Sequence, residues 1–275
     1  MSMSINTNIQ SLTAQRAISL TQVSLSTSMQ RLSTGLRINS AKDDAAGLGI
    51  SDRMTSQVRG LNQAARNAND GISLSQTAEG ALSTMTDMMQ RMRELAVQAA
   101  NGTNTSTDRA SLDAEFGKLK TEIDRIGTST DFNGLKILAG GAGSQVFQVG
   151  ANVNDTITLT TVAATGYTSD AAFAAGIGGA DATKANAAIT AIDASLILIG
   201  TDRGTYGAAQ NTMQFAIQNL QNAAENTAAA RSRILDADFA TETANLSRSQ
   251  ILQQAGTAMV AQANQLPQGV LALLR

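Results

Sequence analysis

The side chains able to do chemistry in this sequence are carboxylates, amines, guanidinium groups and hydroxyls, because its 275 residues include no histidine and no cysteine. That composition removes imidazole acid–base catalysis, thiol nucleophiles, zinc sites built from His and Cys, and disulfides. Asp43 and Asp44 are adjacent carboxylates that would suit a hard cation, but no third carboxylate follows at loop spacing. We interpret them as acids at the start of a helix, where negative charge is favourable.

Two glycine-rich runs, residues 140–143 and 176–179, would be candidates for a phosphate-binding loop. Neither ends in the Lys and Ser/Thr that such loops require, so we interpret both as turns. The arginines near residues 91–93 and 231–233 would be a candidate basic patch, but a formal net charge of -2 and only 2 tyrosines argue against nucleic-acid binding. The sequence therefore predicts no enzyme, no cofactor or metal site, and no nucleic-acid partner.

The composition predicts closely packed helices. Aromatic residues make up 3% of the chain, and its one proline is Pro267. Small and unbranched apolar side chains let helix axes approach one another and favour the helix. The longest aliphatic run, residues 196–199, is far shorter than the roughly 18 apolar residues of a membrane span, so we expect no membrane partner. The N-terminus also lacks the basic and apolar regions of a cleavable secretory signal.

Apolar residues recur in steps of three, four or seven along several stretches, which is the pattern of amphipathic helices. The first stretch reaches Leu36 as one stripe, and a linker is expected between residues 33 and 49. A long helix follows from residue 58 to 96, and its methionines are interpreted as core rather than as an adaptable partner-binding face. Further helices are expected at residues 112–126 and 189–224, the latter with a candidate break between Gly200 and Gly207.

Alternation of apolar and polar residues replaces the helical period between residues 135 and 162. This pattern predicts a small β-hairpin region. Residues 163–184 are rich in Ala, Gly, Ser and Thr and have no clear period, so we expect an irregular, poorly packed insert. The predicted fold is mainly α: a long antiparallel helical hairpin or coiled-coil rod with the β-hairpin region at about residues 135–162.

Both ends of the chain carry apolar stripes that a single copy cannot bury. Such ends are expected to be disordered alone and to fold on assembly with a partner. The residues expected to form this assembly surface are Ile5, Ile9, Leu12, Leu25, Leu32, Leu252, Met259, Leu266, Val270 and Leu273.

Blocks at both ends of the chain resemble the signatures of bacterial flagellin, the subunit of the flagellar filament. RLSTGLRINSAKDDAAGLGISDRM at residues 31–54 is similar to the N-terminal signature, followed by GLNQAARNANDGISLSQTAEGAL at 60–82 and QRMRELAVQAANGT at 90–103. Residues 230–275, ending in NQLPQGVLALLR, resemble the C-terminal signature. The similar regions cover about residues 1–162 and 185–275. The middle departs from many flagellins, because about 20 irregular residues stand where outer domains are often inserted, and this predicts a minimal flagellin.

The resemblance also implies how the chain is divided into domains. Residues 1–40 paired with 236–275 would be the terminal coiled-coil domain of the filament core, and 41–235 the helical-rod domain with its hairpin tip and the insert 163–184. It also implies a secreted, extracellular subunit that forms a helical homopolymer for motility. Export would run unfolded through the type III channel, with a chaperone on the C-terminal helix and with filament cap and hook-junction proteins as further partners.

The resemblance also implies contacts to a Toll-like innate immune receptor through Arg91, Leu95 and Glu115, which match the family pattern. Packing on a helix surface is the plainer interpretation of these three residues. A hook–filament junction protein, which shares the terminal helices, stays open as an alternative. Some family members carry catalytic inserts, but this insert is too short and a His-Glu-x-x-His site is impossible without histidine.

Overall fold

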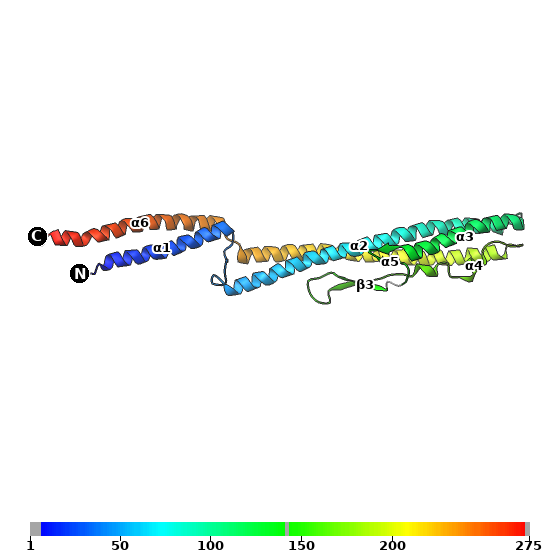
Figure 1. The fold of residues 1–275 in the computed structure, drawn as a ribbon, viewed down its shortest axis with the longest axis horizontal. Helices are drawn as coiled ribbons and strands as arrows, with labels where there is room; N and C mark the ends of the chain where they lie inside the picture. Colours follow the sequence, from blue (N-terminus) through cyan, green and yellow to red (C-terminus); the bar gives the residue numbers. More distant parts are fainter. Residues whose placement is uncertain (1–6, 141–142, 273–275) are drawn as a thin grey trace. The chain divides into compact units, whose positions relative to one another are not determined.

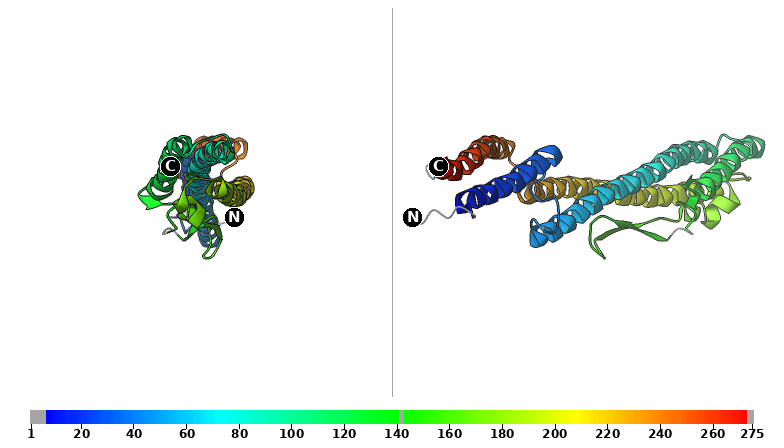
Figure 2. Two further views of the ribbon diagram at one scale, coloured as in Figure 1. Left: turned by 90° about the vertical axis from the view of Figure 1, so that its right-hand side faces the viewer. Right: turned by 60° about the vertical axis from the view of Figure 1, so that its left-hand side comes forward.

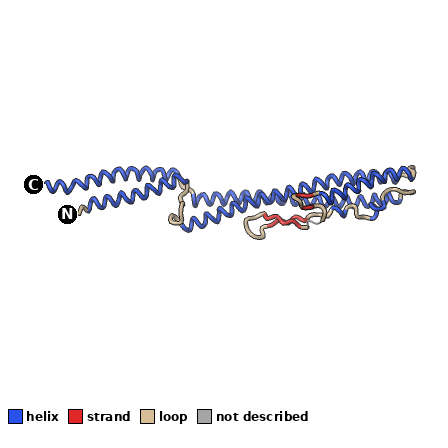
Figure 3. Tube along the Cα trace, in the orientation of Figure 1, coloured by secondary structure: helices blue, strands red, loops and turns tan. Residues whose placement is uncertain are grey.

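The chain is mainly helical, as the sequence predicts (Figures 1 and 3). The computed structural model describes residues 7–140 and 143–272, and the side chains of residues 266–272 lie outside that description. In chain order the elements are α1 (Ile9–Thr34), α2 (Ala45–Ala100), α3 (Ser106–Ser129), β1 (Asp131–Phe132), β2 (Leu135–Lys136), β3 (Ser144–Gln148), β4 (Thr156–Thr160), the short 3-10 helix η1 (Ala164–Gly166), α4 (Ala171–Ala175), α5 (Thr183–Leu235) and α6 (Phe239–Ala272).

The chain divides into two compact units, one made of residues 1–56 with 226–275 and the other of residues 57–225. In the first unit α1 and α6 lie side by side along their lengths (Figure 2). Asn8 begins α1, because its side-chain oxygen accepts a hydrogen bond from the backbone N–H of Ser11. Gly35 ends the helix at a φ of 71°, a left-handed conformation that glycine adopts without a steric cost.

The second unit packs α2, α3 and α5 around an aliphatic core. Met85, Met89 and Met92 are fully buried, which confirms the interpretation of the methionines as core. The helix α5 is continuous from Thr183 to Leu235, so the break considered between Gly200 and Gly207 is absent. The reason is tertiary: Ile192, Ile199, Tyr206 and Met213 recur in steps of seven and are buried on both sides of the glycines, and this packing outweighs their poor helix propensity.

The predicted β-hairpin region is present. The strands β1 and β2 pair around Asn133-Gly134, whose φ angles of 52° and 80° suit a tight hairpin turn. The strands β3 and β4 pair antiparallel from Ser144↔Thr160 to Gln148↔Thr156.

The insert 163–184 is well packed, and the expectation of poor packing is wrong. Its side chains Tyr167, Phe173 and Ile177 are buried, and Phe173 stacks on Phe116 of α3 with ring centroids 6.3 Å apart. The glycine-rich run 176–179 wraps a carboxylate of the chain itself, because Asp113 Oδ1 accepts from the backbone N–H of Ile177 at 2.7 Å. Three well-placed large residues therefore anchor a segment whose average composition suggests a loop.

Candidate functional site

The contact between α1 and α6 is a seven-residue repeat on each helix. The residues facing the seam are Ser11, Ile18, Leu25 and Leu32 on α1, and Glu242, Ser249, Gly256 and Ala263 on α6, all buried or half-buried. The two helices run antiparallel, since residues near the start of α1 meet residues near the end of α6. Steps of seven keep one side of a helix against its partner, as in a coiled coil.

On its α6 side this seam is lined by small and polar groups. The Asn8 Nδ2 atom donates to the backbone carbonyl of Ala263 at 2.7 Å, and the hydroxyl of Ser249 lies 3.5 Å from that of Ser24. Ile18 packs over Gly256, where an added β-carbon would lie 2.7 Å from Ile18 Cγ1. The small residues of α6 let the helices approach closely, while α1 contributes the larger side chains Ile18, Leu25 and Leu32.

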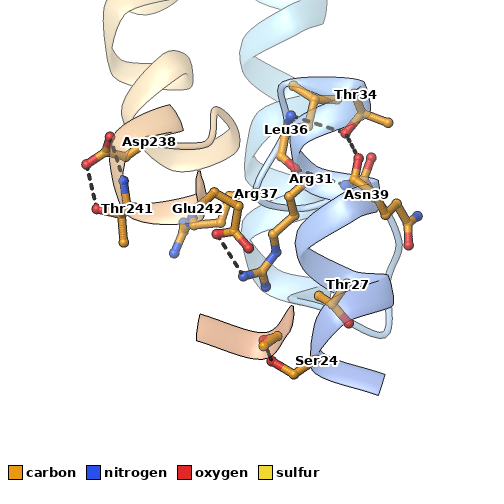
Figure 4. A network of polar contacts seen from close by, with 12 residues as sticks. Ser24, Thr27, Arg31, Thr34, Leu36, Arg37, Asn39, Asp238, Thr241 and Glu242 are labelled. Atoms are coloured by element: carbon orange, nitrogen blue, oxygen red, sulfur yellow. Dashed lines mark hydrogen bonds and ion pairs between the residues drawn. The ribbon is translucent and has the colours of Figure 1, made fainter. Parts of the chain in front are cut away.

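A polar network holds together the end of α1 and the start of α6 (Figure 4). Arg31 of α1 reaches toward Glu242 of α6 with 3.8 Å between Nη1 and Oε2, and within the described part of the chain no acceptor reaches its buried Nε atom. The backbones of Leu36 and Asp236 form an isolated antiparallel β-bridge. The guanidinium of Arg37 donates a hydrogen bond from Nε to the carbonyl of Ile234 at 3.2 Å. Arg37 thereby covers the exposed carbonyls at the end of α5.

Large apolar side chains lie outside the seam. Ile9, Leu12, Leu20 and Val23 are 55–68% exposed, and they occupy the side of α1 opposite Ile18, at about 100° of rotation per residue. We call these four residues the α1 outer face. The single stripe expected along the first helix is therefore wrong, because it is two faces, one toward α6 and one toward solvent.

On α6, Leu252 and Met259 are 51% and 64% exposed and border a groove of about 710 Å³ between the two helices. Its lining includes Ala14, Ala17 and Gly256 and is mostly apolar. Isolated exposed leucines are ordinary, but apolar side chains gathered on one side of a helix or around a groove indicate interaction sites.

The structure places the predicted assembly residues as follows. Ile9, Leu12, Leu252 and Met259 are exposed, and Leu25 and Leu32 are half-buried in the seam. Ile5 and Leu273 lie outside the described residues, as do the side chains of Leu266 and Val270. The sequence interpretation missed Leu20 and Val23, whose spacing from Ile9 and Leu12 was the available signal, and it missed Asn8 and Gly256 in the seam.

The receptor candidates lie in the second unit. Arg91 donates from Nε and Nη2 to Glu115 Oε1 at 3.1 and 3.0 Å, and from Nη1 to Glu94 at 2.9 Å. These hydrogen bonds, that to Glu94 first, raise the pKa of Arg91. Leu95 is only 1% exposed and packs in the core, so the surface here is formed by Arg91, Glu94 and Glu115 without it.

The paired acids Asp43 and Asp44 act as local caps. Asp44 Oδ1 accepts from the backbone N–H of Gly47 at the start of α2, as the interpretation of helix-start acids expects. Asp43 accepts from the N–H groups of Asn39 and Ser40, and these hydrogen bonds lower its pKa. Among the described residues no group of three or more acidic side chains could hold a metal ion. Nor does any helix in the described ranges have the length and hydrophobicity to cross a membrane.

Comparison with protein families matches both ends of the chain. Residues 5–142 match the bacterial flagellin N-terminal helical region, and residues 189–274 match the bacterial flagellin C-terminal helical region. The unmatched stretch between them contains β3, β4 and the insert.

Individual proteins agree with this match. The chain is 48% identical to a flagellin of Halalkalibacterium halodurans, with 99% of this chain and 100% of that protein covered. It is 43% identical to the flagellar filament 33 kDa core protein of Treponema phagedenis, again with 99% and 100% covered. The crystal structure of Bacillus cereus flagellin is similar with a TM-score of 0.50 and 34% identity, over 60% of this chain and 94% of that one.

Proposed function

The chain belongs to the bacterial flagellin family, and we propose that it assembles through the α1 outer face and the groove beside α6. As a member of that family it is a structural subunit of the extracellular flagellar filament and serves motility. It lacks the large variable domains of longer flagellins. The similarity over the whole length of filament proteins favours this function over a hook–filament junction protein.

The observation that carries the proposal is that the α1–α6 pair covers only some of its large apolar side chains in the seam and leaves others exposed on α1 and α6. Burying one leucine or isoleucine from water contributes about 1.5–3 kcal/mol. The seam half-buries Ile18, Leu25 and Leu32, whereas the side chains of the α1 outer face gain this free energy only when a second copy covers them. The α1 outer face and the groove differ from each other, and a contact between unlike surfaces extends into a filament rather than closing.

Seeded polymerisation of Leu252→Asp tests this proposal. A carboxylate buried in the apolar contact would be unpaired, so we expect the critical concentration for elongation of filament seeds to rise by about tenfold or more. The matched control is Gln254→Asp, which adds the same charge at an exposed polar position on another side of α6. Elongation of Leu252→Asp at the unaltered rate, with unchanged circular dichroism for both variants, would refute the proposed surface.

The remaining partners are proposals that rest on membership of the family. The terminal segments 1–40 and 236–275 would form the inner domain of the filament, and 41–235 the surrounding domain. A chaperone would cover the apolar side chains of α6 before export through the type III channel, and cap and hook-junction proteins would meet the same surfaces at the filament ends. The exposure of Leu252 and Met259 supports a chaperone site on this helix.

Recognition by a Toll-like innate immune receptor is proposed at Arg91 and Glu115. Their ion pair on the surface supports a polar contact there. Leu95 would act from beneath by holding α2 in place, since its side chain is buried. Receptor signalling by Arg91→Ala and Glu115→Ala subunits, compared with the unaltered chain, would measure this contribution.

A further inference from the structure

Methionine is the main oxidisable side chain of this protein. The sequence contains no cysteine, no tryptophan and no histidine. Its two tyrosines, Tyr167 and Tyr206, are 3% and 0% exposed. A mild oxidant that reacts at sulfur therefore finds only the thioethers of the 10 methionines.

The methionines divide between the core and the surface. Four of them are fully buried, all in the second unit: Met85, Met89, Met92 and Met213. Met54 and Met88 are half-buried, and residues 1 and 3 lie outside the described part of the chain. Among the described methionines, the exposed ones are Met29 of α1 and Met259 of α6, at 57% and 64%. In this described set, oxidation of the folded subunit therefore begins on α1 and α6.

Met259 lines the groove between α1 and α6, together with Leu252, which lies seven residues earlier and on the same side of α6. Its neighbours in the lining are small, among them Ala255 and Gly256. An unbranched thioether adapts its shape to an irregular partner, which suits a side chain at a contact. Met29 belongs neither to the lining of this groove nor to the α1 outer face.

The groove is poorly supplied with hydrogen-bond donors. The hydroxyls of Thr13 and Thr21 each donate to a backbone carbonyl of their own helix at 2.9 Å. The other polar side chains of the lining are the amides of Gln10 and Gln262. A new acceptor on Met259 therefore depends mainly on water, which reaches it while the groove is open.

Hydrogen peroxide creates such an acceptor by converting the thioether to a sulfoxide. The sulfur of Met259 attacks one peroxide oxygen, so that an S–O bond forms while the O–O bond breaks. A proton passes from the transferred oxygen to the departing one, which leaves as water. Sulfur is oxidised by two electrons and the peroxide is reduced by two. The product is a polar, chiral side chain in place of a flexible apolar one.

A sulfoxide at Met259 affects assembly much more than folding. The side chain is 64% exposed in the subunit, so the new oxygen stays hydrated and the buried core is unchanged. When a second copy covers the groove, water is removed and the oxygen loses hydrogen bonds that the lining does not replace. The same reaction at Met29 places its oxygen outside the groove.

We propose that Met259 is a site of reversible sulfur oxidation that controls whether the subunit can assemble. The inference rests on the proposed function, because the sulfoxide matters only if the groove is an assembly surface. A peroxide adds the oxygen, and a methionine sulfoxide reductase removes it at the expense of a dithiol, which becomes a disulfide while the oxygen leaves as water. The dispersed subunit is open to this oxidation, whereas assembly covers the sulfur.

Competition within one oxidised pool tests the proposal without any substitution. Limited treatment with hydrogen peroxide oxidises most chains at a single methionine, and the pool then elongates isotope-labelled filament seeds. Peptide mass spectrometry compares the sulfoxide fraction at each methionine between the pelleted filaments and the supernatant. We expect the fraction at Met259 to be about tenfold lower in the filaments and the fraction at Met29 to be equal in both. Equal fractions at Met259 would overturn the proposal.

Met259→Leu assigns the effect to this one sulfur, since leucine is similar in volume and has no sulfur to oxidise. The critical concentration for elongation is measured before and after peroxide treatment, and each chain is compared with its own untreated value. We expect treatment to raise it by about tenfold for the unaltered chain and for the matched control Met29→Leu, and to leave it unchanged for Met259→Leu. Equal sensitivity of the two variants would contradict the assignment.

Reversal of the reaction separates this inference from the function on which it rests. Methionine sulfoxide reductase with a dithiol should restore elongation as the sulfoxide at Met259 disappears, while circular dichroism stays unchanged throughout. Elongation that stays lost after the thioether is restored would overturn the proposed control. Failure of the untreated, unaltered chain to elongate seeds would contradict the filament function instead, and normal elongation by untreated Leu252→Asp would contradict the groove as an assembly surface.

Discussion

Gly256 shows how a single residue sets the distance between α1 and α6. Its missing side chain makes room for Ile18, whose Cγ1 would lie 2.7 Å from an added β-carbon. Contacts of this length do not persist, so a larger residue must push the helices apart or force Ile18 out of a favourable rotamer.

We expect Gly256→Leu to weaken the α1–α6 pair by about 1–3 kcal/mol, even though leucine favours the helix. The second substitution Ile18→Ala should restore part of that loss, because it removes the atoms that leucine would meet. Seeded elongation of the two single variants and the double variant measures the coupling. Additive effects would mean that the two residues do not share the contact.

At this scale the sequence predicted chemistry better than orientation. The helical spacing of Met85, Met89 and Met92 correctly predicted that these methionines belong to the core. The sequence analysis assigned Ile9 and Leu12 to the same stripe as Leu25 and Leu32, because steps of three and four fit two adjacent faces of a helix equally well. Only the position of α6 decides which of them is the seam.

Hydrogen bonds to carboxylates at turns and helix starts make the stability of these elements depend on pH. The pKa of Asp108 is lowered by the hydroxyl and N–H of Thr105, and that of Asp238 by the hydroxyl and N–H of Thr241 and the N–H of Ala240. The pKa of Asp43 is lowered in the same way by hydrogen bonds from the N–H groups of Asn39 and Ser40 and from the Ser40 hydroxyl. A carboxyl group whose pKa is lowered in the folded state stabilises that state. This stabilisation is fully present above the ordinary pKa of about 3.9 and is lost as the pH falls through the pKa of the folded state.

The thermal midpoint of the dispersed subunit should therefore be nearly constant from about pH 5 to 8, since no histidine titrates there, and should fall below about pH 4. Asp238→Asn keeps a capping oxygen without the titration, so its midpoint should fall less steeply in acid. Circular dichroism melts across the pH range measure both. A step in the midpoint between pH 5 and 8 would contradict this assignment.

The elements themselves and the linker between the first two helices were largely predictable, whereas the continuity of α5 and the packing of the insert were not. The heptad spacing located the long helices and the alternation located the hairpin. The glycines of α5 suggested a break because local propensity ignores Ile199, Tyr206 and Met213, which anchor the helix around them. The insert seemed loose because composition does not reveal that Phe173 stacks on Phe116 of a distant helix.

For the whole molecule, the proposed function depends on exposed surfaces that a second copy can cover. Two compact units each leave apolar side chains exposed, on α1 and α6 in one and on α5 and the hairpin in the other. A filament subunit needs unlike surfaces that a second copy can cover, because that arrangement grows without closing. The sequence indicated the terminal surface through its unfinished amphipathic stripes, whereas the structure was needed to show that Ile197, Leu198 and Phe215 of α5 are exposed.

Helical reconstruction of the assembled filament by electron cryo-microscopy tests the central claim most directly. The account predicts that Ile9, Leu12, Leu20 and Val23, exposed in the subunit, become buried against a second copy, while Asn8 still donates to the carbonyl of Ala263 across the seam. A filament in which the α1 outer face stays in contact with water would contradict the account.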